Sequence, residues 1–217
     1  MITRFLIIVN VIVFIWEISV AGSGMFSMLG GGGNGMIRVE EDGALWPAAV
    51  LVGHQWWRIV TGAFMHASLL HIVVNMVSLY SLGTFIERAM GSLRMAFIYA
   101  ASLVVSGLGV VYLSAPDVPT LGASGAIFGL FGALFAIGLK LGKPGMELVR
   151  ANLGILILNL VITFTVPQIS WQAHIGGLIA GFILTFLVYF PPRRVAPVVH
   201  DATTGEGYET EYQAPHR

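Results

Sequence analysis

The sequence contains no cysteine and few charged residues. Without cysteine, the chain has no disulfide bond, no thiolate nucleophile and no cysteine-ligated metal site. Charged residues make up 10 % of the 217 residues, against about 25 % in soluble domains, whereas hydrophobic residues make up 56 %. The formal net charge is zero, so there is no electrostatic reason to expect a nucleic-acid partner.

Charge is also missing over long uninterrupted stretches. No Asp, Glu, Lys or Arg occurs within 59–86, 95–116, 118–139 or 151–192. A helix that crosses a bilayer needs about 20 apolar residues, so each stretch can span a membrane once and the last one can span it twice. The predicted fold class is therefore all-α, and the protein is predicted to be a polytopic membrane protein.

Six membrane-spanning helices are predicted, with a tight break at Pro167 between the last two. Their ranges are about 4–22, 68–87, 94–114, 121–140, 148–166 and 170–190. Residues 1–192 form the membrane domain in this prediction, and the polar stretch 193–217 is predicted to be a disordered tail. The first helix could instead be a cleaved signal peptide, because "SVAG" at 19–22 resembles a cleavage site.

The basic residues predict how the helices are oriented. If the N-terminus is inside, nine lysines and arginines fall on the inner side, and only Arg38 and Arg58 fall on the outer side. The positive-inside rule then places both termini and the tail in the cytoplasm. We expect a multi-pass protein of the cell (inner) membrane.

The first outer loop, about 23–67, is long and has two halves. It begins with "GGGGNG" and continues with the apolar stretch "GALWPAAVLVGHQWWRIVTGAF". Trp46, Trp56 and Trp57 in the second half suit the headgroup layer of a bilayer. We therefore expect this half to be embedded in the membrane as a hairpin.

Four polar side chains lie inside the predicted helices, close to their outer ends. His71 and Asn75 are four residues apart and share one helix face, whereas Ser124 and His174 each lie in the first turn of a helix. At ~1.5 Å of rise per residue, all four lie within about 10 Å of the outer helix ends. Strongly polar side chains inside a membrane are costly and indicate function.

Each of these residues has a structural explanation when it is taken alone. Ser124 could cap a helix or pack against a neighbour, and His71 with Asn75 could form an interhelical hydrogen bond. Small-residue faces favour the chemical interpretation, because they let the fourth and sixth helices approach closely enough for Ser124 to hydrogen-bond His174. The glycines that form these faces are Gly125, Gly129, Gly132, Gly177 and Gly181.

Together the four residues are suited to acyl transfer. A serine hydroxyl becomes a nucleophile when a neutral imidazole takes its proton, so Ser124 is the candidate nucleophile and His174 the candidate base. His71, Asn75 and the backbone N–H of Ser124 can donate hydrogen bonds to an oxyanion. No acid in the same layer can orient His174, which favours a Ser–His dyad over a triad.

Other intramembrane chemistries are less well supported. The sequence has no H-E-x-x-H motif, and we expect no metal and no cofactor. All three aspartates, Asp42, Asp117 and Asp201, lie outside the predicted helices, which excludes a two-aspartate protease. A channel or transporter is disfavoured, because no buried charge is expected in the helices and no paired broken helices occur in corresponding halves.

The remaining polar residues of the helices are given structural roles. Glu17 is expected near the outer interface. Glu87 is expected to cap or pair at the inner end of the second helix, with Arg88 or Arg94 as a candidate partner. Asn159 is expected to form a hydrogen bond between helices.

With these residues in place, the sequence resembles the rhomboid family of intramembrane serine proteases. The resemblance covers about residues 44–190 and rests on several motifs in the family's order. These are "QWWRIVTGAFMH" at 55–66, "HIVVN" at 71–75, "LGTFIERAMGS" at 82–92, "GASG" at 122–125 and "AHIGGLIAG" at 173–181.

The resemblance implies a role for each matching residue. Ser124 would be the nucleophile, His174 the base, and His71 and Asn75 the oxyanion donors. Phe128 stands where many members have a tyrosine stacked on the catalytic histidine, so the ring is kept and the hydroxyl is lost. Structural motif residues would be Trp57, Arg58, Glu87, Gly122, Gly125, Gly177 and Gly181.

The resemblance also implies a six-helix bundle and a reaction. The protein would hydrolyse peptide bonds in or beside the transmembrane segments of other membrane proteins, within the lipid bilayer and near its outer face. A substrate could enter laterally between the second and fifth helices. The alternative is a rhomboid-like pseudoprotease that binds membrane proteins without cleaving them.

Overall fold

Six long helices dominate the computed structural model, which describes residues 1–21, 34–191, 198–200 and 207–209. All six are long and apolar enough to cross a membrane, which confirms the predicted number of spans. They are α1 (Ile2–Ala21), the continuous run of α5 (Leu69–Ser78), η2 (Leu79–Gly83) and α6 (Thr84–Met90), α7 (Ser92–Leu113), α8 (Ser124–Leu141), α9 (Lys143–Thr165) and α10 (Trp171–Val188). The chain is a multi-pass integral membrane protein.

The boundary of α9 differs from its predicted position. This helix begins at Lys143, five residues before the predicted start at 148, and a proline lies in its first turn. Proline is favoured there because the first N–H groups of a helix have no intrahelical partner. Gly142 precedes the helix with φ +68°, a conformation that favours glycine. The predicted range left out Lys143 and Glu147, the charged residues of the first two turns.

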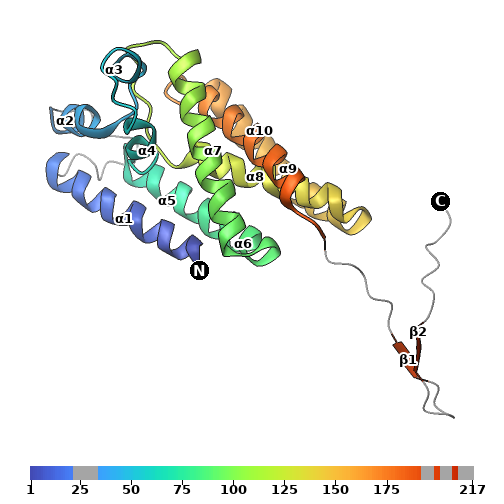
Figure 1. Cartoon of the computed structure of the whole chain (residues 1–217). Coiled ribbons are helices and arrows are strands. Elements are labelled where there is room, and N and C mark those ends of the chain that lie inside the picture. Colours follow the sequence, from blue (N-terminus) through green and yellow to red (C-terminus); the bar gives the residue numbers. More distant parts are fainter. Residues whose placement is uncertain (22–33, 192–197, 201–206, 210–217) are drawn as a thin grey trace.

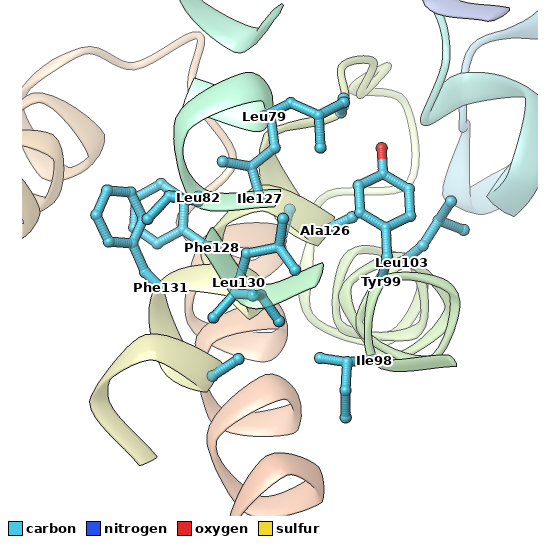
Figure 2. Close-up of a cluster of buried hydrophobic side chains, with 14 of the residues drawn as sticks. Leu79, Leu82, Ile98, Tyr99, Leu103, Ala126, Ile127, Phe128, Leu130 and Phe131 are labelled. Atoms are coloured by element: carbon cyan, nitrogen blue, oxygen red, sulfur yellow. The ribbon is translucent and has the colours of Figure 1, made fainter. Parts of the chain in front are cut away.

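The centre of the bundle is α8, which lies among the other helices in Figure 1. Of its 18 residues, 13 are buried, whereas only 4 of the 23 residues of α9 are buried. A helix that is apolar all round belongs in an interior. Figure 2 shows side chains of η2, α7 and α8 pointing toward one another in the main hydrophobic core, among them Leu79, Ile98 and Leu130.

Glycines set the spacing between α8 and α10. A Cβ atom added to Gly177 would overlap the carbonyl oxygen of Gly125, and one added to Gly181 would overlap that of Gly129. On the α7 side of α8, a Cβ on Gly125 would overlap the hydroxyl of Ser106. The backbones of α8 and α10 therefore touch, as in small-residue contacts between membrane helices.

Glu87 ties α1 to the rest of the bundle. Its carboxylate accepts hydrogen bonds from the backbone N–H groups of Ile2 (2.7 Å) and Thr3 (3.0 Å), and from the hydroxyls of Thr3 (2.6 Å) and Ser92 (2.5 Å). The expected cap is therefore found, but on the N-terminus of α1, whose free N–H groups favour an anion. The suggested pairing with Arg88 or Arg94 is wrong.

The long loop before α5 contains three short helices, α2 (Asn34–Gly43), α3 (Pro47–Leu51) and α4 (Arg58–Gly62). Leu45 and Thr120 exchange two backbone hydrogen bonds of 2.9 Å, which attach this loop to the α7–α8 connection. Arg58 donates to the carbonyl oxygens of Ala44 (2.8 Å) and Glu41 (2.7 Å), and its guanidinium lies 4.7 Å from the ring centroid of Trp57. These contacts give Trp57 and Arg58 their places within the loop.

The loop lies at one end of the bundle, together with the connections before α8 and α10. We call this the loop end, formed by residues 44–68, 114–123 and 166–170. The prediction of a disordered tail falls mostly outside the described residues. Of that stretch, the structure describes β1 (Val198–His200) and β2 (Gly207–Glu209), which pair antiparallel.

Candidate active site

Ser124 and His174 meet at the loop end. The hydroxyl oxygen of Ser124 lies 2.8 Å from Nε2 of His174, although the two residues are 50 positions apart in the chain. Ser124 is the first residue of α8, and His174 lies in the first turn of α10. Ser170 starts α10 by accepting a hydrogen bond from the N–H of Ala173 (3.2 Å). Ser124 and His174 thus meet because each lies at the start of its helix and because α8 and α10 pack closely together.

Phe128 holds the imidazole of His174 from one face. The two rings are stacked, with centroids 4.0 Å apart and an angle of 12° between their planes. Phe128 lies one turn after Ser124 on α8, so one helix carries both the hydroxyl and the ring that touch His174. The stack restricts rotation of the imidazole and leaves its Nε2 directed at Ser124.

Thr163 on α9 holds the other ring nitrogen. Its Oγ1 lies 2.7 Å from Nδ1 of His174, and it also donates a hydrogen bond of 2.6 Å to the carbonyl oxygen of Asn159. Thr163 is not among the site residues predicted from the sequence. A threonine near the end of an apolar helix gives no stronger signal than Thr165, which is exposed and bonds only within its own helix.

His71 approaches the same point from α5. A Cβ atom added to Gly122 would lie 2.8 Å from Nε2 of His71 and 3.8 Å from the hydroxyl of Ser124. Gly122 has φ +126°, which only glycine adopts readily. Glycine is therefore required here both by the backbone conformation and by the lack of room for a side chain beside His71. Nδ1 of His71 accepts from the N–H of Ala67 at 3.4 Å. In that tautomer the Nε2–H group of His71 is a donor directed toward the site.

Asn75 has a local partner that the sequence analysis did not expect. Its Nδ2 donates a hydrogen bond of 2.9 Å to the carbonyl oxygen of His71, and its side chain is buried. An amide group carries two hydrogens, so one N–H of Asn75 remains for another acceptor. Asn159, by contrast, is half-buried and donates to the carbonyl oxygen of Ile155 within α9 (2.8 Å), so the expected interhelical bond is wrong. The peripheral position of α9 is the reason.

Behind His71 lies a second buried polar group. Glu17 is fully buried, and its two oxygens accept the backbone N–H of His66 at 2.9 and 3.2 Å. The backbone N–H of His66 gives this buried carboxyl group its hydrogen-bond donor, and His66 belongs to the loop end. The ring of His66 packs edge-on against that of His71, with centroids 5.0 Å apart. Burial, and to a lesser extent His71, lowers the pKa of His66 to about 3.

The chemistry available at the site follows from these contacts. A hydroxyl, an imidazole and a donor N–H group converge beside Gly122, where a carbonyl group could be attacked. Within the part of the chain that the structure describes, no three His, Asp or Glu side chains are grouped to hold a metal ion. Glu87, Arg58 and Trp57 lie apart from this convergence and support the fold.

Comparison with known proteins gives a consistent result. The model of the Rhomboid domain family matches residues 53–190, which is more than half of the chain. Rhomboid protease GluP of Bacillus subtilis (strain 168) is 37 % identical over 138 residues, 63 % of this chain and 27 % of GluP. Putative rhomboid protease YdcA of the same organism is 34 % identical over 134 residues, 61 % of this chain and 67 % of YdcA. The chain thus spans about a quarter of GluP and two thirds of YdcA.

A further relative differs in its described activity. Inactive RHOMBOID-like protein 8 of Arabidopsis thaliana is 33 % identical over 166 residues, 75 % of this chain and 47 % of that protein. Overall similarity therefore does not separate cleaving from non-cleaving relatives. The individual side chains at the loop end have to make that distinction.

Proposed function

The chain belongs to the rhomboid family, and we propose that it is an active serine endopeptidase that cleaves transmembrane proteins. The observation that carries the proposal is the 2.8 Å contact between the hydroxyl of Ser124 and Nε2 of His174. A serine this close to an imidazole, whose plane is held by Phe128, has the arrangement of an activated nucleophile. His71 supplies a donor on the neighbouring side.

The reaction would proceed through an acyl-enzyme. Nε2 of His174 takes the hydroxyl proton as Oγ of Ser124 attacks the scissile carbonyl carbon, and the resulting oxyanion accepts hydrogen bonds from His71, Asn75 and the Ser124 N–H group. The C–N bond then breaks, and His174 gives its proton to the leaving amine. Water attacks the ester with the same base, and the acid product leaves with Ser124 regenerated.

The expected substrates are membrane proteins, cut in or next to a transmembrane segment. A peptide bond inside a regular helix is shielded by its neighbours, so small or helix-breaking residues should be favoured around the cut. We propose that the loop end faces the extracytoplasmic side of the cell membrane and that both termini face the cytoplasm, as the distribution of basic residues favours. Entry of the substrate between α5 and α9 fits this arrangement.

The second candidate function is that of a pseudoprotease, which binds membrane proteins without cleaving them. The relative described as inactive is the observation that favours it. The intact contact between Ser124 and His174 favours cleavage instead, because a protein that only binds has no need of an activated serine. The two candidates differ in one measurable property, the reactivity of Ser124.

Labelling with a fluorophosphonate tests this reactivity without knowledge of the substrate. The purified protein should be labelled covalently and should cleave a model transmembrane substrate, and Ser124→Ala and His174→Ala should each abolish both signals. Ser19→Ala is the matched control, because Ser19 is an exposed serine of α1 that bonds only to the carbonyl of Trp16. A wild-type protein that is folded, unlabelled and inactive on many substrates would establish the pseudoprotease. Cleavage by Ser124→Ala would refute the mechanism.

A further inference from the structure

We infer that Thr163 on α9 is a positioning residue for His174, and that it selects the ring tautomer in which His174 can act as a base. The inference rests on the proposed function, because it concerns the same proton transfer. Its basis is the pair of contacts made by one hydroxyl group: Oγ1 of Thr163 with Nδ1 of His174 (2.7 Å) and with the carbonyl oxygen of Asn159 (2.6 Å).

The single hydroxyl hydrogen decides the direction of these bonds. The carbonyl oxygen of Asn159 can only accept, so the hydrogen of Thr163 is used there. The hydroxyl oxygen must then accept from the ring, which requires the hydrogen of the neutral imidazole to be on Nδ1. Nε2 is left with a lone pair, and it faces the hydroxyl of Ser124 at 2.8 Å. Thr163 thereby has one of the two roles of the buried acid in a Ser–His–Asp triad: it holds the imidazole in the tautomer that can act as a base.

The opposite tautomer is disfavoured at this place. With its hydrogen on Nε2, His174 would need a donor at Nδ1, and Thr163 could supply one only by giving up its bond to Asn159. Both side chains are buried, Thr163 with 3 % and His174 with 7 % of its surface exposed. Exchange with solvent water is therefore restricted on the Thr163 side, where an unpaired group would stay unpaired.

The groups around the imidazole leave this role to Thr163. Phe128 from α8 covers one ring face and has no hydrogen-bonding group, and Ser124 from α8 engages Nε2. The titratable neighbour of His174 on α5 is His71. Its ring lies against Gly122 and Ala67 and does not contact Nδ1 of His174. Within the described residues, Thr163 is the hydrogen-bond partner of Nδ1.

The position of Thr163 also links the base to α9. Among the described residues, the bond between Thr163 and His174 is the one side-chain hydrogen bond that joins α9 to another helix. Few residues of α9 are buried, and its close backbone contact with α8, between Gly145 and Gly138, lies at the other end of the helix. If α9 moved so that Thr163 lost its hydrogen bond to His174, the imidazole could adopt either tautomer. The base is therefore held in the active tautomer only while this part of α9 packs against α10.

The test compares three variants of the full-length protein in detergent. Thr163→Val keeps the shape and removes the hydroxyl, Thr163→Ser keeps the hydroxyl, and Thr165→Val removes a hydroxyl that bonds only to Val161 and Ile162 of the same helix. Fluorophosphonate labelling and cleavage of a model transmembrane substrate should fall at least about 10-fold in Thr163→Val, through kcat rather than KM, because a catalytic histidine in the wrong tautomer cannot take the serine proton. Thr163→Ser should recover most of the rate, and Thr165→Val should match wild type.

A second measurement reads the tautomer directly and needs no activity. In protein labelled with ¹⁵N-histidine, the ring signals of His174, assigned by comparison with His174→Gln, should show hydrogen on Nδ1 in wild type and a mixture of tautomers in Thr163→Val. Hydrogen on Nε2 in wild type, or an unchanged signal and rate in Thr163→Val, would overturn the inference. If the wild type shows the Nδ1–H tautomer but neither labels nor cleaves, the proposed function fails while the positioning role stands.

Discussion

Substitution of Gly177 by alanine should separate α8 from α10 and break the contact between Ser124 and His174. The added Cβ would overlap the carbonyl oxygen of Gly125, which directly follows Ser124. A carbon atom in contact needs about 3.5 Å, so the helices must move apart by about 1 Å or more at this level. His174 lies three residues before Gly177, about 4.5 Å along the helix axis, and moves with it.

The magnitude follows from the hydrogen bond that is lost. A shift of about 1 Å would lengthen the 2.8 Å contact beyond hydrogen-bonding distance, and misplacement on this scale costs about 100-fold in rate. Overpacking of a tight helix contact also lowers the free energy of unfolding by about 1–3 kcal/mol. The assay is the rate of fluorophosphonate labelling, together with the midpoint of thermal unfolding in the same detergent.

Two further glycine variants separate activity from stability. Gly181→Ala makes the same kind of overlap, with the carbonyl of Gly129, but lies about 10 Å from His174 along α10. It should lower stability as much as Gly177→Ala while it slows labelling less. Gly154→Ala on α9 is the control, because no atom lies within 4 Å of its added Cβ. Labelling of Gly177→Ala at the wild-type rate, or a larger loss in Gly181→Ala, would refute the reasoning.

Two other predictions concern buried polar groups away from the reacting atoms. The pKa of His66 is about 3 in the folded protein against 6.5 in the unfolded chain, so the unfolded state binds an additional proton below pH 6.5 and stability falls as pH decreases from there toward 3. His66→Phe should remove up to about 1.4 kcal/mol of this dependence per pH unit. The measurement is the midpoint of unfolding of both proteins from pH 7 to pH 5. If the two midpoints fell equally with decreasing pH, the prediction would be wrong. Glu87→Gln replaces one accepting oxygen by an NH₂ group and so loses bonds to the start of α1, which should lower the free energy of unfolding by about 1–3 kcal/mol with little effect on the labelling rate of Ser124. An unchanged midpoint in Glu87→Gln would show that the carboxylate does not hold α1.

Much of the fold could be predicted because its signals are local. The length of an apolar stretch determines whether a helix can cross a membrane, so the six spans could be predicted from local composition. The site residues were proposed for a related reason. Ser124 and His174 lie at the same depth at the starts of two helices, and depth in a bilayer can be counted along the chain.

The hydrogen-bond partners of several polar side chains in the helices could not be predicted from the sequence. Glu17 is buried in the protein, where it accepts a hydrogen bond from the backbone N–H of His66, 49 positions away in the chain. Glu87 was paired with neighbouring arginines, but its partners are at the start of α1, more than 80 residues away. Asn159 was expected to bridge helices, but its side chain donates to the carbonyl oxygen of Ile155 within α9. No local pattern distinguishes these outcomes.

The sequence by itself thus determined the membrane-spanning class, the number of helices and the candidates Ser124 and His174, because hydrophobic length and depth are properties of each segment alone. Only the tertiary structure decided that Thr163, and not Thr165, reaches His174. Both threonines sit near the end of the same helix and bond to it in the same way. The difference is which of them faces α10, and this depends on the packing of α9 against helices elsewhere in the chain.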